Sequence, residues 1–320
     1  MSEKPTVSVI IPTYNGAAFA VEAVDSVLAQ TRPPDEIIVI DDGSTDDTQS
    51  RLARYADRIR YIRQSNGGVA NARNHGIQES RGSLIAFLDG DDRWLPEKLE
   101  RQLECLAAHP EADLIHTNFL HWNDHTGELT PVKPGLERYT GSCFQEFFWR
   151  CGVKTSTVLL TRRCLERVGL FDEHIPGGGS VEDFDLFLRV ARHFQLAFVP
   201  EPLALYRHHG SNATLDTRRI LESLFWVTER SFAMDRAFVT ALGPQRVRRH
   251  MRSLAFTAGY GHAEKGDLRN ARRMFRCALR YAPVSPYIWA LWVSTLIPHD
   301  MRRWLRSLKQ RFAPRRVSPA

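Results

Sequence analysis

Residues 84–92 read LIAFLDGDD, and this stretch decides the fold class. Its apolar part has the length and composition of a strand that is covered on both faces, as in a parallel sheet. Asp89, Asp91 and Asp92 then stand where that strand leaves the sheet. Carboxylates so close together repel one another when ionised, as an unperturbed Asp is at pH 7. Either a shared cation offsets the repulsion, or the stretch is an ordinary solvated turn.

Outward from this stretch, strand-like and helix-like segments alternate along the first hundred residues. Strands are expected at 7–11, 36–42, 58–64 and 83–89, and helices at 17–30, 45–56 and 69–80. This βαβ rhythm predicts an α/β fold with a mostly parallel central sheet flanked by helices. Later strands are expected at 113–119, 156–161 and 196–207, with a helix at 181–194. In such sheets ligands bind at the carboxyl ends of the strands.

A second acidic segment, DDGSTDD (41–47), follows the second expected strand. Ser44 or Thr45 can cap the next helix, and the two acids after them suit the positive end of its dipole. This explanation leaves Asp41 and Asp42 without a structural task. At a strand exit they can accept hydrogen bonds from a base or a ribose.

The acids of the DGDD turn offer ligands for a hard divalent cation. Mg²⁺ or Mn²⁺ binds one or two carboxylates and fills its other positions with phosphate oxygens and water. Asn71 and Arg73, one helix earlier, could add hydrogen bonds to the same phosphates or to a sugar. An exposed position on an amphipathic helix explains Arg73 equally well.

Two further groups of polar residues occur late in the chain. Glu182, Asp183 and Asp185 begin a half-buried helix, where the helix dipole alone would favour acids. Apolar neighbours can also raise the pKa of such a carboxylate toward that of a useful general base. His208 and His209 follow the last expected strand; they are either solvated or structural, or close enough to reach a metal or a diphosphate.

Composition describes an ordinary globular protein of 320 residues, with 43% hydrophobic and 25% charged residues. Its five cysteines are odd in number and scattered without a CxxC pair, which argues against a disulfide framework and fits a reducing cytosol. The N-terminus has too few apolar residues for a signal peptide. The longest apolar stretch, 287–297, is about half the length that spans a bilayer. A cytoplasmic protein without a transmembrane helix is therefore expected.

The charge is unevenly distributed. Residues 243–320 hold 17 Lys and Arg against three acids, which leaves 26 bases and 34 acids in the remainder. Spacings in 259–283 resemble one tetratricopeptide repeat, which cannot bury its own face and is expected as a helical hairpin packed on the main domain. Residues 301–312 form a basic amphipathic pattern that suits either an anionic membrane surface or packing on the protein itself. No nucleic-acid motif accompanies this charge, and no nucleic-acid partner is expected.

Taken together, the chain resembles the family 2 glycosyltransferases of the GT-A fold. The matching stretches are 7–16, 26–31, 36–48, 66–77, 84–100, 168–173, 181–190 and 206–214. The resemblance implies a glycosyltransferase domain at 5–215, with a Rossmann-like nucleotide-binding half, and leaves 216–320 as a basic helical C-terminal region. It also implies a nucleotide-sugar donor, most often a UDP-sugar, and Mn²⁺ or Mg²⁺ as cofactor.

The resemblance also assigns roles to residues. In the motif called DxD, Asp89 and Asp91 are the two acids, and Asp91 is expected to touch the metal. Asp183 is expected to be the general base of an inverting transfer. His209 matches a late histidine that contacts the metal or the diphosphate. The positions that contact the base and ribose are Pro12, Tyr14 and Asp42, with Asp41 beside them.

The expected reaction moves a sugar to a hydroxyl of a glycan or of a lipid-linked acceptor, which agrees with a role in polysaccharide biosynthesis for the cell envelope. The enzyme is thus expected in the cytoplasm, where its basic C-terminal helix would allow docking on the inner membrane face. Two other functions remain open. A nucleotidyltransferase would release pyrophosphate, and a catalytically inactive module would bind the nucleotide or carbohydrate without transfer.

Overall fold

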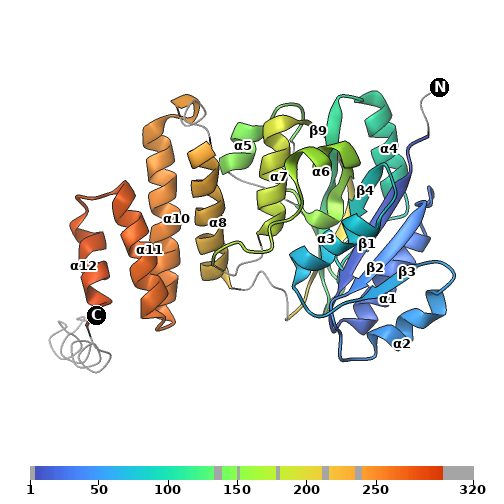
Figure 1. Ribbon diagram of the computed structural model, residues 1–320, viewed down its shortest axis with the longest axis horizontal. Coiled ribbons are helices and arrows are strands. Elements are labelled where there is room, and N and C mark those ends of the chain that lie inside the picture. Colours follow the sequence, from blue (N-terminus) through green and yellow to red (C-terminus); the bar gives the residue numbers. More distant parts are fainter. Residues whose placement is uncertain are drawn as a thin grey trace, which may run out of the picture. The chain divides into compact units, whose positions relative to one another are not determined.

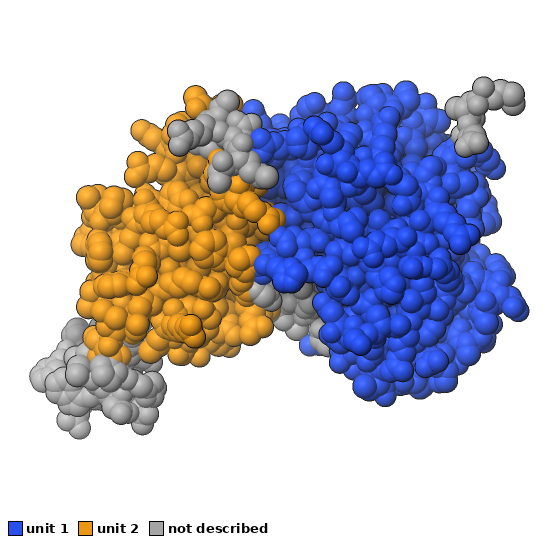
Figure 2. Space-filling view, viewed as in Figure 1, with its two compact units in different colours: residues 1–175, 181–212 blue, residues 176–180, 213–320 orange. Residues whose placement is uncertain are grey.

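The computed structural model describes residues 4–132, 139–149, 152–177, 181–210, 216–234 and 240–297. Its chain divides into two compact units (Figures 1 and 2). Unit 1 comprises residues 1–175 and 181–212, and unit 2 comprises residues 176–180 and 213–320. Within the described ranges, no helix combines the length and apolarity needed to cross a bilayer. The basic pattern at 301–312 lies outside them.

One mixed sheet forms the centre of unit 1. Four parallel strands lie in the order β3-β2-β1-β4: β1 (Val7–Thr13), β2 (Glu36–Asp41), β3 (Arg60–Arg63) and β4 (Leu84–Phe87). Beyond β4 follow β8 (Val158–Thr161), β6 (Ala112–Asn123), β9 (Gln195–His208) and β5 (Arg93–Trp94), while β7 (Leu129–Pro131) pairs with β6. Strand β8 is antiparallel to both of its neighbours, and β6 and β9 are parallel. The expected mostly parallel α/β sheet is confirmed.

Helices cover this sheet. They are α1 (Ala17–Leu28), α2 (Thr48–Leu52), α3 (Val69–Glu79), α4 (Lys98–Ala108), α5 (Phe144–Trp149), α6 (Arg162–Val168) and α7 (Glu182–His193), with short 3-10 turns η1 (Ala53–Tyr55) and η2 (Thr155–Thr157). All seven residues of β1 are buried, as its apolar run predicts. Helix α3 approaches β1 closely at Gly76, where an added Cβ would lie 2.4 Å from the Cγ2 atom of Ile10.

Unit 2 is helical in its described parts: α8 (Thr217–Met234), α10 (Pro244–Glu264), α11 (Leu268–Tyr281) and α12 (Pro286–Ser294). Helices α10 and α11 form the expected hairpin. Asp267 caps α11 by accepting a hydrogen bond from the backbone N of Asn270 (3.2 Å). Within unit 2, this hairpin packs on α8 and α12, so its apolar face has partners inside its own unit.

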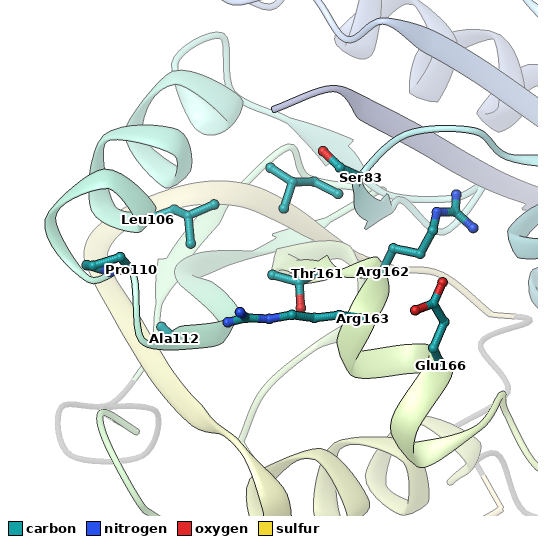
Figure 3. Close-up of a pocket in the computed structure, with 9 residues that line it drawn as sticks. Ser83, Leu106, Pro110, Ala112, Thr161, Arg162, Arg163 and Glu166 are labelled. Carbon is teal, nitrogen blue, oxygen red and sulfur yellow. The ribbon is translucent and has the colours of Figure 1, made fainter. Parts of the chain in front are cut away.

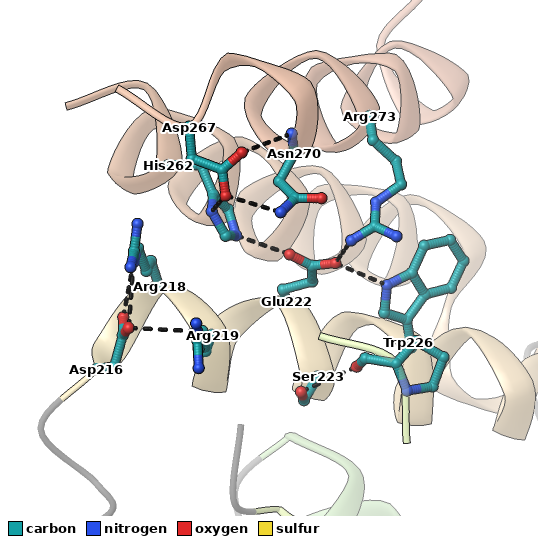
Figure 4. A network of polar contacts seen from close by, with 11 residues as sticks. Asp216, Arg218, Arg219, Glu222, Ser223, Trp226, His262, Asp267, Asn270 and Arg273 are labelled. Carbon is teal, nitrogen blue, oxygen red and sulfur yellow. Dashed lines mark hydrogen bonds and ion pairs between the residues drawn. The ribbon is translucent and has the colours of Figure 1, made fainter. Parts of the chain in front are cut away.

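A buried carboxylate ties three helices of unit 2 together (Figure 4). Glu222 of α8 is 1% exposed and accepts from His262 Nε2 of α10 at 2.7 Å. Its other oxygen accepts from Arg273 of α11 and, at 3.4 Å, from the indole N of Trp226. A buried charge with this many partners fixes the positions of the helices that supply them.

Candidate functional site

The acidic segments meet at the carboxyl ends of the parallel strands in unit 1. Asp42 directly follows β2, and Asp89 lies two residues beyond β4. Between the acids of the DGDD turn, Gly90 passes close to β1, because an added Cβ would lie 2.7 Å from the carbonyl O of Pro12. The backbone N of Asp92 donates to Asp89 O at 2.9 Å, so the stretch is a β-turn as well as an acidic cluster.

Asp41 and Asp42 have structural tasks that the sequence analysis did not foresee. Asp41 accepts from the backbone N of Ser44 (2.8 Å) and from the hydroxyl of Tyr61. Asp42 accepts from the backbone N of both Gly67 and Gly68 (2.8 Å each) and from Gln64. Both carboxylates are buried. The expectation that no structural role exists for them was wrong, because strand β3 and the loop after it supply donors that the local sequence does not reveal.

The capping prediction was also wrong. Neither Ser44 nor Thr45 caps α2; instead Asp46 Oδ1 accepts from Thr48 N at 3.1 Å. The hydroxyl of Ser44 accepts from Asn15 N at 2.9 Å, which joins the loops after β1 and β2. In the first of these loops, Tyr14 leaves 53% of its surface exposed and presents an aromatic ring at the strand end.

Arg73 joins the two acidic groups of the chain. This arginine of α3 is almost fully buried and donates to Asp89 Oδ1 and to Glu182 Oε1, both at 2.6 Å. Burial opposes its charge, yet Asp89 and Glu182 hold the pKa of Arg73 above its ordinary value. Arg73 is therefore not an exposed helix residue. Asn71 instead lies at the rim, where it bonds Gln64 and Glu173.

Asp91 pairs with His209, the two residues predicted to lie near the metal. His209 Nε2 lies 2.9 Å from Asp91 Oδ2, and the carboxylate of Asp91 remains about a third exposed. Burial and the like charge of Asp89 raise the pKa of Asp91. A cation would relieve this repulsion.

Asp92, the third acid of the turn, is a structural residue. It is 1% exposed and accepts from Ser156 Oγ (2.5 Å) and from the backbone N of Arg207 (3.0 Å). Burial, followed by the charges of Asp91 and Asp89, raises its pKa well above the ordinary value. Asp92 thus anchors the turn and leaves the other two acids to face the site.

Asp183 lies in the first turn of α7, beside Glu182. Burial and the charge of Glu182 raise the pKa of Asp183 to about 6, while Arg73 and Lys154 act in the opposite direction. The hydroxyl of Thr155 lies 3.4 Å from Asp183 Oδ2. A carboxylate with this pKa is ionised at neutral pH and is basic enough to accept a proton.

A group of rings around Lys154, whose charge acts on Asp183, was missed by the sequence analysis. Tyr206 and His208 lie on one face of β9, and His121 lies opposite Tyr206 on β6. His121 Nδ1 and His208 Nε2 are 2.8 Å apart, and Lys154 Nζ lies 4.6 Å from the centre of the Tyr206 ring. The HH pair in the sequence was a signal, but its ring partner His121 lies 87 residues away from His208.

A separate hollow lies at the opposite edge of the sheet (Figure 3). It encloses about 470 Å³ between the start of β4, the start of β6 and the start of α6. Its two arginines already have partners: Arg163 forms a forked pair with Asp113 (2.6 and 3.0 Å), and Arg162 donates to carbonyl oxygens of Gly82 and Ser80. This hollow is therefore a weaker candidate for a charged ligand than the carboxyl edge.

Comparison with known proteins identifies the family. The model of the family described as Glycosyl transferase family 2 matches residues 8–168, half of the chain. This protein belongs to glycosyl transferase family 2. The matched region contains the acids that follow β2 and β4 and extends to the end of α6.

Two relatives illustrate the reach of this similarity. An uncharacterized glycosyltransferase of Rickettsia felis is 33% identical over 241 residues, which are 74% of this chain and 38% of the relative. The Bacillus subtilis protein named putative teichuronic acid biosynthesis glycosyltransferase TuaG is 45% identical over 107 residues, 32% of this chain and 42% of its own. The family 2 chain thus spans about two fifths of each of these relatives.

Solved structures show the same fold over nearly the whole chain. S. aureus TarS 1-349 in complex with UDP superposes with a TM-score of 0.62 at 15% identity, covering 98% of this chain and 94% of TarS. The mannosyltransferase PcManGT from Pyrobaculum calidifontis, in complex with GDP-Man and Mn²⁺, gives a TM-score of 0.59 at 18% identity, covering 97% and 88%. The GT-A fold of this family 2 protein is therefore confirmed.

The side chains that could coordinate a metal determine how it would fit this family 2 site. Among the described residues, no cluster of three or more His, Cys, Asp or Glu side chains could hold a metal ion. Asp91 and His209 lie together and partly open, which gives two protein groups rather than a closed cage. Mg²⁺ and Mn²⁺ prefer such sites, since phosphate oxygens and water complete their coordination. The residues fit a metal shared with a bound diphosphate.

Proposed function

We propose that this family 2 protein is an inverting glycosyltransferase. It moves a sugar from a nucleoside-diphosphate sugar, with a UDP-sugar as the proposed donor, to a hydroxyl of a glycan or a lipid-linked acceptor. One observation carries the proposal: Arg73 holds Asp89, in the turn after β4, and Glu182, the neighbour of Asp183, on the same guanidinium. The acid expected on the phosphate side, Asp89, and the expected base, Asp183, therefore lie at the same edge of the sheet.

For the donor, the loops after β1 and β2 supply the nucleotide contacts. The exposed ring of Tyr14 stacks on the base, with Pro12 behind it in β1. Asp41 and Asp42 hold these loops in shape, and a spare lone pair on either carboxylate accepts from the base or the ribose. Asn71 and Arg73 face the sugar and the phosphates. TarS with UDP and PcManGT with GDP-Man support this class of donor.

For the transfer, Asp91 and His209 would hold Mn²⁺ or Mg²⁺. A bound metal of this kind supplies positive charge that stabilises a departing nucleoside diphosphate. Asp183 accepts the proton of the acceptor hydroxyl while the oxygen attacks the anomeric carbon. The bond to the diphosphate breaks on the opposite side, so one displacement inverts the anomeric configuration. Asp89 and Glu182 keep Arg73 in place between donor and base.

Unit 2 offers support for contact with a membrane surface. Large apolar side chains are exposed on and around α12, namely Val284, Tyr287, Trp289, Val293 and Leu296. The basic charge of residues 243–320 would favour anionic lipids. We therefore propose a peripheral position on a membrane, where a lipid-linked acceptor is available. TuaG, named for teichuronic acid biosynthesis, supports a polymer-building role. A cytoplasmic location stays a prediction.

The proposal is tested by calorimetric titration of UDP, GDP, CDP and TDP, with and without Mn²⁺. We expect one diphosphate to bind in a metal-dependent manner to the wild type and not to Asp91→Ala. Asp57→Ala, an exposed acid beyond α2, is the matched control and should bind as the wild type does. Transfer assays with the corresponding nucleotide sugar should then release a nucleoside diphosphate. Release of pyrophosphate would indicate a nucleotidyltransferase, and binding without any release an inactive module.

A further inference from the structure

The ring group on β6 and β9 faces away from the metal-side residues of the same strand. Side chains alternate along a strand, so Tyr206 and His208 lie on one face of β9. Arg207, and His209 just after the strand, instead bond Asp91. Ring centroids within the group are close: 6.1 Å for His121 and Tyr206, 4.9 Å for His121 and His208. The group therefore forms a continuous ring surface beside the site, separate from Asp91.

Lys154 brings a positive charge to this surface. Its Nζ lies over the Tyr206 ring, and its charge contributes to the lowered pKa of His121, after burial and His208. The next residue, Thr155, has its hydroxyl 3.4 Å from Asp183 Oδ2. The cation thus stands between the rings and the carboxylate that we propose as the base.

Among the described residues, this cation forms no ion pair, because no Asp or Glu oxygen lies within ion-pair distance of Lys154 Nζ. Its side chain instead lies over the Tyr206 ring. Arg73, by contrast, has two carboxylates, and Arg207 pairs with Glu22 and Asp124. A partly buried lysine that has no close ion pair in the described part of the chain, and whose charge acts on Asp183 only at longer range, is available to a ligand.

We propose that Lys154, Tyr206, His121 and His208 form a subsite for a negatively charged group of the acceptor, a carboxylate or a phosphate. The lysine would pair with the charge, the ring edges would pack on the sugar, and imidazole N–H groups would donate to its oxygens. This deepens the proposed function, on which it rests, by giving the acceptor a class: an acidic sugar or a phosphate-bearing glycan. A hydroxyl of such an acceptor would lie next to Asp183.

The test measures charge preference directly. Three probes are titrated: methyl β-glucuronide, glucose 6-phosphate and the neutral methyl β-glucoside. The proteins are the wild type, Lys154→Arg, Lys154→Met and Lys4→Met. Each protein is first saturated with Mn²⁺ and with the nucleoside diphosphate that it binds. In the wild type, both charged probes should bind about tenfold more tightly than the neutral one, as expected for a charge-assisted contact. Lys154→Arg should keep the preference and Lys154→Met should lose it. Lys4, exposed before β1, is the matched control and should change nothing.

Two results would overturn the subsite. One is equal binding of charged and neutral probes by the wild type. The other is a loss of nucleoside diphosphate affinity in Lys154→Met as large as its loss of probe affinity, which would assign Lys154 to the donor. The titrations are repeated without nucleotide. If no nucleotide binds, the proposed function fails, while the charge preference of the subsite is still measured and decided.

Discussion

Arg207 Nε donates to the backbone carbonyl O of Asp91 at 2.7 Å, across 116 residues of sequence. The same arginine is 2% exposed, pairs with Glu22 and Asp124, and lies against the rings of Phe19 and Trp122. It holds the DGDD turn through this backbone carbonyl rather than through the Asp91 carboxylate. The position of the proposed metal ligand thus depends on a residue that does not contact the metal.

Replacement of Arg207 by Met should therefore destabilise unit 1. Two carboxylates would lose their shared partner, and we expect a loss of roughly 3 kcal/mol in the free energy of unfolding. Chemical denaturation monitored by tryptophan fluorescence measures this loss. Arg207→Lys keeps the charge without the forked geometry and should recover only part of it. An unchanged denaturation midpoint in Arg207→Met would contradict the stabilising role of Arg207.

Asp91 and Asp92 should respond differently to the same change. Asp91→Asn should abolish metal-dependent binding of a nucleoside diphosphate, because the partly exposed carboxylate is the proposed ligand. Asp92→Asn should retain it, since an amide can still accept from Arg207 N and can donate to the Ser156 hydroxyl. The free energy of unfolding of Asp92→Asn should differ from that of the wild type by about 1 kcal/mol or less. Calorimetric titration of both variants with the nucleoside diphosphate and metal tests this difference. Equal loss of binding in both variants would contradict the separate roles of Asp91 and Asp92.

The pH dependence of transfer should follow Asp183. With a pKa of about 6, its basic form predominates at pH 7, and kcat/KM should fall roughly tenfold between pH 7 and pH 5. The charges that surround it are Glu182, Arg73 and Lys154. Lys154 lowers this pKa, so Lys154→Met should move the acid limb of the profile to higher pH. A limb that stays in place would show that Lys154 does not act on the base.

Lys98 should make the stability of unit 1 depend on pH. This lysine of α4 is fully buried, with Nζ 2.7 Å from Gln102 Oε1 and 3.9 Å from the Trp94 ring centre. Burial lowers its pKa well below 10.5, so the unfolded chain binds more protons between the two values. Unfolding free energy should then rise with pH through this window, by up to about 1.4 kcal/mol per unit. Lys98→Met should lack that slope, and identical slopes would refute the prediction.

Glu222 should be the most sensitive position in unit 2. Glu222→Ala leaves His262 without its buried partner and removes the bond from Arg273, at an expected cost of roughly 3 kcal/mol. Arg273 is nearly half exposed, and Arg273→Met should cost less than about 1 kcal/mol. Thermal unfolding followed by circular dichroism compares the two. Equal costs would show that the buried His262 contact adds nothing.

The sequence predicted those features that depend on neighbouring residues. The strand at 84–87 and the turn after it follow from local pattern, as do the helix that begins at Glu182 and the hairpin of α10 and α11. Whether a given acid faces ligand or protein depends on distant partners. Asp92 is covered by Ser156, and Asp42 receives its donors from the loop at 66–68, so no local pattern reveals their burial.

Lys154 escaped prediction for the same reason. Nothing in its neighbouring sequence marks it as unpaired, because an ion pair is a property of the folded chain. The Asp89 and Asp183 groups were singled out because acids are conspicuous in sequence. The sequence around Arg73, which joins the two groups through Asp89 and Glu182, was equally consistent with an exposed position.

The anchoring of Asp92 has a consequence for biosynthesis on the ribosome. Its two partners are encoded 64 and 115 residues downstream, so the carboxylate emerges from the exit tunnel long before either can reach it. A nascent chain that ends before Arg207 can pair β1 to β4, but it leaves this acid without its second donor. The carboxyl ends of the parallel strands therefore reach their final arrangement only late in translation.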